Sequence, residues 1–567
     1  MIVGIDLGTT NSAAAVWRDG GAELVPNSLG HLLTPSAVSL GDDGELLIGL
    51  AARERQSTHP KLTATAFKRY MGTNRRLTLG KRQFSPEELS ALVLSSLKAD
   101  AEAFTGEPVE SVVITVPAYF NDKQRRATRR AGELAGLKVE RLINEPTAAA
   151  LSYGIHERGL EEPYLVFDLG GGTFDVSLVE MFDGIIEVRA SAGDNQLGGE
   201  DFNQVLVSYA QDQLGAALAD RGDPLALKEV IREAAERARR ALSESDETVL
   251  RFVWNGEEFT VPIDAATFAE RAESLIARLR EPVLRSLRDG STRVDELAEI
   301  VLVGGSTRMP LVRKAVARMF GRFPNATVHP DHAVALGAAV QAGLRSRNQD
   351  LDEVRLTDVC PFTLGVEVSE RGGRGGVRDG IFSPIIERNT VIPASRVERY
   401  HTMVDNQEKI VLRVYQGEAR DVQANVRLGE LSVDVPRKKA GEVSVDCRFT
   451  YDTSGLLEVD VAVVGTDIVR QLLIYDSDDD ALSRNLDARR EALAALKVHP
   501  RDKSANAAAL ARAERCYEGH LAGKRIYVGE LISQFEAVLS SQDERKIDIA
   551  RTELLEQLDR IEGDSYL

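Results

Sequence analysis

The chain is poor in cysteine and contains no long apolar run. Its 567 residues include three cysteines, Cys360, Cys447 and Cys516, which lie far apart and form no CxxC pair. This scattered, odd set argues against a disulfide framework or a zinc site, so we expect a reducing compartment and a small core residue at each position. No apolar run approaches the roughly 20 residues of a membrane helix. The first apolar run starts at Ile2, so no signal peptide is expected.

Positive charge is also in deficit. Lysine and arginine total 70 against 88 aspartates and glutamates, which gives a net charge of −18. Attraction to nucleic acid or to an anionic membrane is therefore not expected, and solubility is the simplest explanation of the acidic balance. The remaining composition, 43% hydrophobic and 28% charged, is typical of globular proteins, and the length predicts several domains.

The common nucleotide-binding signatures are missing as well. The sequence has no GxxxxGKS or GxxxxGKT loop and no GxGxxG that opens a helix after a strand. In their place, two segments are almost alike, and each follows a short apolar run that predicts a strand. These segments are Asp6-Leu7-Gly8-Thr9-Thr10 and Asp168-Leu169-Gly170-Gly171-Gly172-Thr173.

Each segment pairs a carboxylate with a tight turn of glycine and threonine. Glycine permits a positive φ, and successive N–H groups of such a turn can converge on an anion. The carboxylate repels phosphate, but it can hold Mg²⁺ or its waters, and the metal then bridges to phosphate. Two such turns that face each other would hold one polyphosphate from both sides. The pair therefore predicts nucleotide hydrolysis or phosphoryl transfer.

Residues 1–353 alternate apolar strands with amphipathic helices, an α/β pattern in which the two aspartate turns predict two similar halves facing a cleft. The expected strands include 112–116, 164–167, 176–181, 185–190 and 300–303. The expected helices include 86–104, 122–135, 201–218, 224–243 and 267–287.

The periodicity changes after a short connector at 354–358. Val443, Val445, Cys447 and Phe449 alternate with polar residues, and this period of two predicts half-buried antiparallel strands over 359–476. From 477 to 567 the period becomes helical, with apolar stripes that predict a small helical segment. The glycine-rich run at 372–376 is expected to be a mobile loop.

Three further segments carry candidate chemistry. The glycines of 303–310 let backbone approach a flat ligand, and Arg308 can stack on a base. Glu145 begins a predicted helix at a position from which it can order water or metal. Lys68 could bring positive charge to a γ-phosphate, although taken alone it is better explained as a solvated surface lysine.

Long motifs in this chain resemble the heat shock protein 70 family of DnaK-type molecular chaperones. The motifs follow one another in the family's order, and the resemblance runs from residue 2 to about residue 475. They are the segments 4–12, Val116-Pro117-Ala118-Tyr119-Phe120-Asn121-Asp122, 143–150, 168–175, 197–202 and 303–310. The overall length and the segment 382–390 are most similar to the short bacterial branch called HscC. The resemblance implies a multidomain chain in four parts. These are an actin-like two-lobed ATPase domain of α/β class at 1–353, a linker at 354–358, an antiparallel β-sandwich peptide-binding domain at 359–476 and a short α-helical lid at 477–567.

The same resemblance implies an ATP-dependent chaperone that binds extended apolar segments of unfolded proteins. ATP hydrolysis would switch the peptide site between fast-exchanging and retaining states. The implied cofactors are ATP or ADP and Mg²⁺, with K⁺ as a further candidate. The implied partners are client peptides and a J-domain co-chaperone, with a nucleotide exchange factor as a further candidate, but neither nucleic acid nor membrane. We expect a bacterial, cytoplasmic protein.

Individual residues match the family's site. Asp6 and Asp168 match the carboxylates that organise the waters of Mg²⁺, and Glu145 belongs to the same metal shell. Lys68 matches the lysine near the γ-phosphate and the attacking water. The implied catalytic set is Lys68, Glu145, Asp168, Thr173 and Asp175. The implied nucleotide-binding set is Gly8, Thr9, Thr10, Asn11, Gly170, Gly171, Gly172, Thr173, Gly198, Gly199, Glu236, Arg239, Arg240, Ser243, Gly304, Gly305, Ser306, Arg308 and Asp331. Pro117 and Arg125 match a relay toward the second domain.

The chain departs from the family pattern in three places. Arg239 stands where the family usually has lysine, which keeps the charge but changes its geometry. Arg355 and Thr357 stand in the connector where leucines are common, so weaker docking of the connector on the ATPase lobe is expected. The helical tail is shorter than a full lid. In addition, no terminal Glu-Glu-Val-Asp is present, so tail-recognising co-chaperones of the eukaryotic type are not expected.

A peptide site in the β-domain follows from the same comparison. The implied cleft residues are Val366, Tyr400, Ile410 and Leu412, and the implied arch residues are Ser369 and Met403. Ordinary core packing is the competing explanation for each of them, because alternating apolar residues in a strand usually face a core.

Two other classes of protein share part of this pattern. An actin-like filament protein or metabolite kinase would share the aspartate turns but lacks the connector and the β-then-helix tail. A passive peptide binder, or an exchange factor for another chaperone, would hydrolyse ATP slowly or not at all. The intact Asp6, Lys68, Glu145, Asp168 and Thr173 argue against that second alternative.

Overall fold

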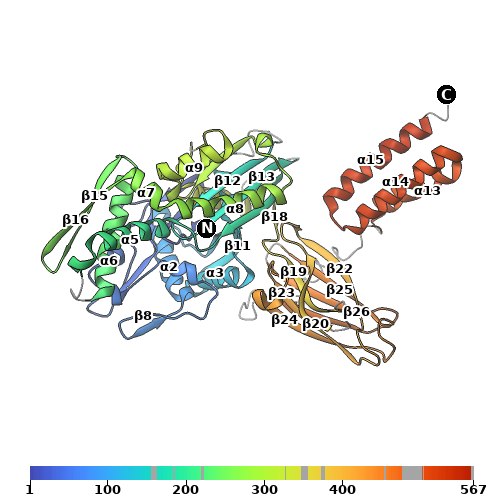
Figure 1. Cartoon of the computed structure of the whole chain (residues 1–567), viewed down its shortest axis with the longest axis horizontal. Coiled ribbons are helices and arrows are strands. Elements are labelled where there is room, and N and C mark those ends of the chain that lie inside the picture. The colour runs from blue at the N-terminus through green and yellow to red at the C-terminus, as the bar shows by residue number, and fades with distance from the viewer. Residues whose placement is uncertain are drawn as a thin grey trace. The chain divides into compact units, whose positions relative to one another are not determined.

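The chain folds into two compact units in this computed structural model, Met1–Phe362 and Thr363–Leu567 (Figure 1). The structure describes residues 1–154, 162–182, 185–218, 223–325, 327–346, 355–371, 377–452, 455–474, 501 and 503–563. The predicted glycine-rich loop at 372–376 lies outside the described residues.

The first unit contains two sheets of similar topology, which we call the sheets of the first and second lobes. In each sheet, parallel strands lie beside an antiparallel meander, so that the first strand of the meander is central. The first lobe has the order β11 (Lys138–Asn144), β10 (Ser111–Val116), β1 (Ile2–Asp6), β2 (Asn11–Arg18) and β3 (Gly21–Val25). The second has the order β17 (Glu299–Val303), β12 (Tyr164–Leu169), β13 (Phe174–Phe182) and β14 (Ile185–Asp194), continued by β18 (Arg355–Val359).

The repeated topology explains why the two aspartate segments look alike. Strand β1 is buried through its middle and ends on Asp6, and the turn that follows leads into β2. Strand β12 is buried throughout and carries Asp168 near its end, before the turn into β13. Central strands of this kind need apolar residues on both faces, which is why both segments begin as continuous apolar runs.

Close packing of small residues joins the two lobes. Helix α10 (Ala333–Arg345) packs on α4 (Glu145–Ser152) and on β1. A Cβ atom at Gly337 would lie 1.7 Å from the carbonyl oxygen of Ala148, and one at Gly4 would lie 2.3 Å from the backbone nitrogen of Ala339. These distances are shorter than any van der Waals contact, so both positions require glycine.

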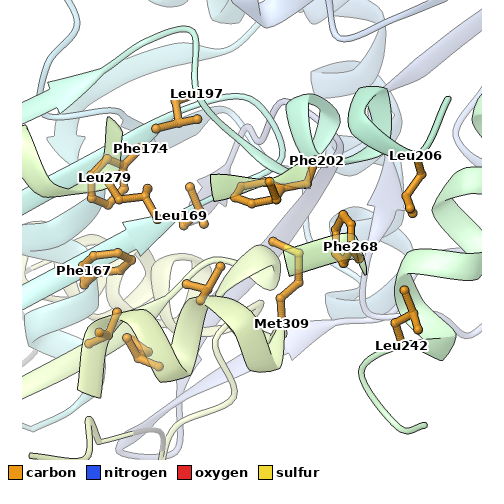
Figure 2. Close-up of a cluster of buried hydrophobic side chains, with 14 of the residues drawn as sticks. Phe167, Leu169, Phe174, Leu197, Phe202, Leu206, Leu242, Phe268, Leu279 and Met309 are labelled. Atoms are coloured by element: carbon orange, nitrogen blue, oxygen red, sulfur yellow. The ribbon is translucent and has the colours of Figure 1, made fainter. Parts of the chain in front are cut away.

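A large apolar cluster fills the second lobe (Figure 2). Phe167 and Phe174, on the neighbouring strands β12 and β13, have ring centroids 4.7 Å apart. Helix α5 (Gly199–Leu218) contributes Phe202, and the segment before α9 (Pro310–Phe320) contributes Met309. Because this core continues to the turn after β12, it fixes the position of that turn relative to the helices.

Most of the expected helices form, with caps that the sequence encodes. Helix α2 (Pro86–Thr105) begins with a capping box between Ser85 and Glu88, and α3 (Asp122–Leu134) with one between Asn121 and Gln124. Helix α6 (Pro224–Ala241) follows Asp223, whose side chain accepts a hydrogen bond from the backbone of Leu225.

The single helix expected at 267–287 is wrong, because two helices occupy this stretch. They are α7 (Ala265–Arg271) and α8 (Glu273–Asp289), and Ala272 between them has φ −90° and ψ 2°. Ala272 is fully buried in the core of the second lobe. Tertiary packing therefore turns the chain at a residue whose own helix propensity is the highest of all.

The remaining elements of the first unit are short. Figure 1 shows β15 and β16 as a hairpin, and β15 contacts α6. The bounds are β4 (Thr34–Pro35), β5 (Ala37–Leu40), β6 (Leu46–Ile48), β7 (Thr63–Thr65), β8 (Leu77–Leu79), β9 (Arg82–Phe84), β15 (Glu247–Trp254), β16 (Glu257–Asp264) and α1 (Leu50–Glu54).

Most of the connector predicted at 354–358 is a strand. Residues Arg355–Val359 form β18, which pairs in parallel with β14, so that Ile185 lies opposite Arg355 and Glu187 opposite Thr357. A connector with Arg355 and Thr357 in place of the common leucines therefore still adds a strand beside β14.

The second unit contains two antiparallel four-stranded sheets and a group of helices. The first sheet has the order β20 (Val377–Ile386), β19 (Leu364–Arg371), β23 (Lys409–Gln416) and β24 (Val426–Asp434). The second has the order β22 (Ala394–His401), β25 (Ser444–Tyr451), β26 (Leu457–Val463) and β27 (Val469–Ile474). The helices are α13 (Ser504–Gly519), α14 (Ala522–Ser540) and α15 (Glu544–Gly563), and a two-residue strand β21 (Val391–Ile392) completes the unit.

The period-two pattern of the sequence matches the observed burial. In β25, Val445, Cys447 and Phe449 are fully buried, whereas Ser444, Asp446 and Arg448 are half-buried. The helical stripes form one core that includes Val528, Phe535, Leu554 and Leu558. All three cysteines are free and buried, which confirms the prediction of small core residues.

We expect Gly337→Ala to lower the free energy of unfolding of the first unit by about 3 kcal/mol or more, because the added methyl group overlaps the backbone of α4. Chemical denaturation followed by circular dichroism measures the change. The matched control is Gly215→Ala on α5, where a Cβ atom would meet nothing within 4 Å. That variant should be stabilised by about 0.5–1 kcal/mol. Equal stability of the two variants would contradict the close packing described for α10.

Candidate functional site

A cavity of about 510 Å³ lies between the two lobes of the first unit. The turns that follow β1 and β12 both contribute to its wall, together with α6 and the turn after β17. The carboxylates at the ends of β1 and β12 therefore open into the same space.

The two glycine turns are in direct contact. A Cβ atom at Gly171 would lie 1.8 Å from Thr10 Oγ1, and one at Gly172 would lie 2.5 Å from Thr9 Cγ2. Gly198 approaches from behind, since its Cβ would lie 2.4 Å from the backbone nitrogen of Gly172. Any side chain at these glycines would push the two turns apart, so the sequence keeps backbone N–H groups of both lobes available to one ligand.

Side-chain and backbone hydrogen bonds fix the shape of each turn. Ser36 Oγ donates to the carbonyl oxygen of Gly8 at 2.7 Å. Ser306 Oγ donates to the carbonyl oxygen of Gly170 at 2.8 Å, and the N–H of Gly199 donates to that same oxygen at 3.0 Å. With their carbonyl groups occupied in this way, the turns are held before any ligand binds.

Four carboxylates gather at the base of the cavity. Glu145, Asp168 and Asp175 are buried, and Asp6 is half-buried. Burial, together with the nearby charge of Glu145, raises the pKa of Asp6 to about 7 and that of Asp175 to about 7. Burial and the charges of Glu145, Asp175 and Asp6 raise the pKa of Asp168 well above its usual range. The site therefore holds more negative charge than it can stabilise by itself.

One buried lysine partly compensates this charge. Lys68 Nζ lies 2.8 Å from Glu145 Oε1, and the exposed fractions of the two side chains are 3% and 9%. The ammonium group also lies 5.6 Å from the centre of the Phe120 ring, within the range of a cation–π interaction. The alternative of a solvated surface lysine is therefore wrong.

The donor set fits a hydrated magnesium ion rather than a ligand cage. Asp6 accepts a hydrogen bond from Thr115 Oγ1 at 3.0 Å, which leaves its second oxygen for the cavity. Among the residues that the structure describes, no three histidine, cysteine, aspartate or glutamate side chains are arranged as a direct metal site. Mg²⁺ usually keeps several waters and takes one or two carboxylates, so a group of carboxylates beside an open cavity suits it.

The far end of the cavity combines α6 with the turn after β17. Glu236, Arg239, Arg240 and Ser243 face it from α6 and its end. Arg239 Nε donates to Asn203 Oδ1 at 2.7 Å, and burial lowers the pKa of the Arg239 guanidinium.

Opposite α6, Arg308 lies 3.6 Å from Asp331, and a Cβ atom at Gly305 would lie 2.3 Å from Asp331 Oδ1. More than half of the Arg308 side chain is exposed, so its planar group is free to lie over a flat ligand.

Most of the sequence-predicted residues line this one cavity. Of the catalytic and nucleotide-binding candidates, Asp175, Gly172 and Gly198 do not line it: Asp175 lies behind Asp168 on β13, and the two glycines pack against the turns. The sequence analysis missed seven lining residues, Leu33, Glu200, Asn203, Glu244, Met309, Pro330 and Val334. Four of them directly precede or follow a predicted residue in the chain, and this proximity could have identified them. These four are Glu200, Glu244, Met309 and Pro330.

Ion pairs join the lobes on both sides of the turns. Arg53 lies 2.5 Å from Glu236, and Arg69 lies 2.6 Å from Asp201. In both pairs the arginine comes from the first lobe and the acid from the second, so opening of the cavity breaks both.

The predicted relay residues lie below the site. Arg125 Nη2 donates to Asn144 Oδ1 at 2.6 Å and to the carbonyl oxygen of Ala118 at 3.1 Å. Its Nε donates to the carbonyl oxygen of Phe120 at 3.0 Å. Arg125 therefore ties the segment after Pro117 to the residue that precedes Glu145.

The peptide-site candidates lie in the sheets of the second unit. Val366, Ile410 and Leu412 are buried on β19 and β23, as core packing also requires. Tyr400 on β22 shares a 3.0 Å hydrogen bond with Ser383, and burial raises the pKa of its hydroxyl. Ser369 Oγ donates to Asp379 Oδ1 at 2.6 Å, and the N–H of Met403 donates to Gln407 Oε1 at 2.9 Å.

None of the helices in the described part of the chain is both long enough and apolar enough to cross a membrane. This agrees with the absence of long apolar runs from the sequence.

The raised pKa of Asp6 has a measurable consequence. Because the folded state holds this proton more tightly than the unfolded state, stability is lost as the pH rises from 3.8 to about 7. We expect Asp6→Asn to remove that loss. Without Mg²⁺ and nucleotide, the variant should gain about 1–3 kcal/mol at pH 8 and much less at pH 4.

The matched control for this measurement is Asp42→Asn. The hydrogen bond from Arg55 lowers the pKa of the exposed Asp42, so the control should lose stability at pH 8 rather than gain it. Thermal unfolding at the two pH values distinguishes the variants. If Asp6→Asn destabilises the protein at pH 8, the carboxylates do not repel one another as described.

A family model described as Hsp70 protein matches residues 2–79 and 75–564, which is nearly the whole chain.

Proposed function

The chain belongs to the Hsp70 family, and we propose that the cavity between its two lobes is the ATPase site. As a member of that family it is an ATP-dependent molecular chaperone that binds segments of unfolded proteins, and its ATP hydrolysis is coupled to that activity. The proposal concerns which residues of this chain do the work. It depends on one observation: two glycine turns in contact above three buried carboxylates, a half-buried fourth and a single buried lysine.

The phosphates of ATP would lie between the two turns. Backbone N–H groups of the segments 9–11 and 171–173 would donate to phosphate oxygens, as nests of this kind do. The N–H groups of Gly8 and Gly170 instead donate to Ser12 Oγ and to the carbonyl oxygen of Thr173, which holds each turn closed. The packing of Gly171 against Thr10 supports this role, because it leaves the turns without side chains that would exclude the phosphates.

The nucleoside would lie at the other end, among Glu236, Arg239, Arg240 and Ser243 on one side and Gly304, Gly305, Ser306, Arg308 and Asp331 on the other. Gly198 and Gly199 would support the phosphate turn from behind.

The carboxylates require a cation, and Mg²⁺ fits them. Asp6, Glu145 and Asp168 would hold it through its waters, with K⁺ as a further candidate for the remaining charge. A bound Mg²⁺ ion would neutralise charge that develops on the phosphate oxygens during transfer.

The remaining charged groups would act on the attacking water. Lys68, held at 2.8 Å from Glu145, is positioned to donate to the water or to a γ-phosphate oxygen. Thr173, which lines the cavity, would orient the water on the other side. The neighbouring Asp175 would receive the proton by way of Thr173 or a second water, since its raised pKa permits it to accept a proton near neutral pH. No side chain has to form a covalent intermediate in this arrangement.

For the second unit, we propose that Val366, Tyr400, Ile410 and Leu412 form the floor of a peptide cleft and that Ser369 and Met403 form an arch over it. Their support is the match to the family, which holds extended peptides in this domain, and the apolar character of the floor. The proposed domains are the ATPase domain at 1–353, the linker at 354–358, the β-sandwich at 359–476 and the lid at 477–567.

The finer identity of the chain is also a proposal. We propose that the chain belongs to the HscC branch, because its overall length and its segment 382–390 are most similar to that branch. We infer a bacterial source from the likeness to that branch, and a reducing cytoplasm from the three free cysteines. A J-domain co-chaperone is the proposed partner, with a nucleotide exchange factor as a further candidate.

We expect Lys68→Ala to lower the rate of single-turnover ATP hydrolysis by about 100-fold or more, because the site loses the buried cation beside Glu145. The affinity for ADP should change little. Lys98→Ala on α2, which removes a lysine paired only with Glu102, serves as the control and should keep the full rate. If the intact chain hydrolyses ATP no faster than Lys68→Ala, the proposed catalytic site is wrong and the chain is a passive binder. Polymerisation on addition of ATP would favour the actin-like filament proteins instead.

We expect Arg355→Leu to strengthen the coupling between ATP and peptide. A more apolar β18 should dock more firmly beside β14, so ATP should accelerate release of a labelled apolar peptide by about 5-fold or more beyond the wild-type effect. Arg355→Lys keeps the charge and should resemble the wild type. If release does not depend on nucleotide in any of the three proteins, the coupled cycle is refuted for this chain.

A further inference from the structure

An aromatic contact lies at the very end of the first unit. The ring of Phe362, its last residue, packs against the ring of Tyr119 with the centroids 4.4 Å apart and an angle of 46° between the planes. Tilted aromatic pairs at this separation are attractive beyond the area that they bury. Phe362 follows β18 by three residues and directly precedes the second unit.

Tyr119 is held on every side by the first unit. Its hydroxyl accepts a hydrogen bond from Arg285 Nη1 at 3.3 Å, and its carbonyl oxygen accepts one from Asn195 Nδ2 at 2.9 Å. Gly193 lies close to Tyr119 as well, because a Cβ atom added at Gly193 would be only 3.1 Å from the Cβ of Tyr119. The position of Tyr119 therefore depends on these hydrogen bonds together with the packing of its ring, and Phe362 supplies part of that packing.

The backbone of Tyr119 in turn holds a carboxylate of the proposed site. Its N–H donates to Asp175 Oδ1 at 3.0 Å. Asp175 is almost completely buried and lies opposite Asp168 in the pairing of β13 with β12. A shift of Tyr119 therefore changes the direction in which the Asp175 carboxylate points, while the strand that carries Asp175 stays in place.

We propose that Phe362 is a positioning residue for ATP hydrolysis, which acts through Tyr119 on Asp175. The inference rests on the proposed function, because Asp175 must take part in hydrolysis for its orientation to matter. Removal of the Phe362 ring lets the Tyr119 segment relax, lengthens the hydrogen bond from its N–H and leaves Asp175 misaligned toward the water. Nucleotide contacts are untouched, since neither Phe362 nor Tyr119 lines the cavity.

The test uses the full chain in four forms: wild type, Phe362→Ala, Phe362→Tyr and Lys68→Ala. Single-turnover hydrolysis of Mg-ATP and the affinity for a fluorescent ADP analogue are measured for each. Phe362→Ala should lower the hydrolysis rate by about 2- to 12-fold, the range expected for loss of one aromatic pair, with unchanged affinity. Phe362→Tyr keeps the ring and should restore the rate, which a loss of general stability would not allow.

Three further variants make the result specific. Tyr119→Leu should lower the rate to a similar degree, and the double variant Phe362→Ala/Tyr119→Leu should be no slower than the worse single variant. Phe259→Ala, which breaks the stacked pair with Phe252 in the hairpin of β15 and β16, should reduce thermal stability and leave the rate unchanged.

The outcomes separate the two proposals. If the wild type hydrolyses ATP well above Lys68→Ala but Phe362→Ala equals the wild type, the inference fails and the proposed function stands. Additive effects in the double variant, or an equal loss in Phe259→Ala, would also overturn the inference. If the wild type is no faster than Lys68→Ala, both proposals fall together.

Discussion

The accumulation of negative charge between the lobes is the constraint on which the rest of the first unit depends. Three buried carboxylates and a half-buried fourth share one small region with one buried lysine. Like charges in a region of low dielectric raise one another's pKa values, and those of Asp6 and Asp175 both reach about 7. Such a cluster is costly for the folded protein by itself, because burial and mutual repulsion both oppose ionisation of these carboxyl groups.

The glycine contacts decide how close the two lobes come. Gly171 and Gly172 bring the turn of the second lobe against Thr9 and Thr10, while Gly337 lets α10 lie directly on α4. Bulkier residues would separate the carboxylates and relieve their repulsion, but they would also widen the cavity beyond the reach of one polyphosphate. The ion pairs of Arg53 with Glu236 and of Arg69 with Asp201 span the same contact between the lobes. The lobes are thus held together by close backbone packing, by ion pairs and by the apolar cluster around α4 and α10.

Several features of this arrangement follow from local sequence. The strand ends that carry Asp6 and Asp168, the turns after them, the caps of α2 and α3 and the alternation of β25 are all encoded within a few neighbouring residues. The break at Ala272 could not be predicted, because alanine favours a continuous helix and only burial in the lobe core turns the chain there. Leu33 and Asn203 were missed for a similar reason, since each reaches the cavity from an element that carries no motif at its own position.

The sequence by itself determined the two acidic glycine turns, the change from α/β to alternating strands to helices, and the family to which the chain belongs. Period, turn chemistry and motif order are local quantities, and they can be read one segment at a time. Only the tertiary structure decided that Lys68 is buried beside Glu145, that Asp175 lies behind Asp168 and accepts a hydrogen bond from Tyr119, and that Phe362 packs on that tyrosine. Contacts between residues so far apart in the chain depend on how the sheets and helices close upon one another, and no local pattern encodes that.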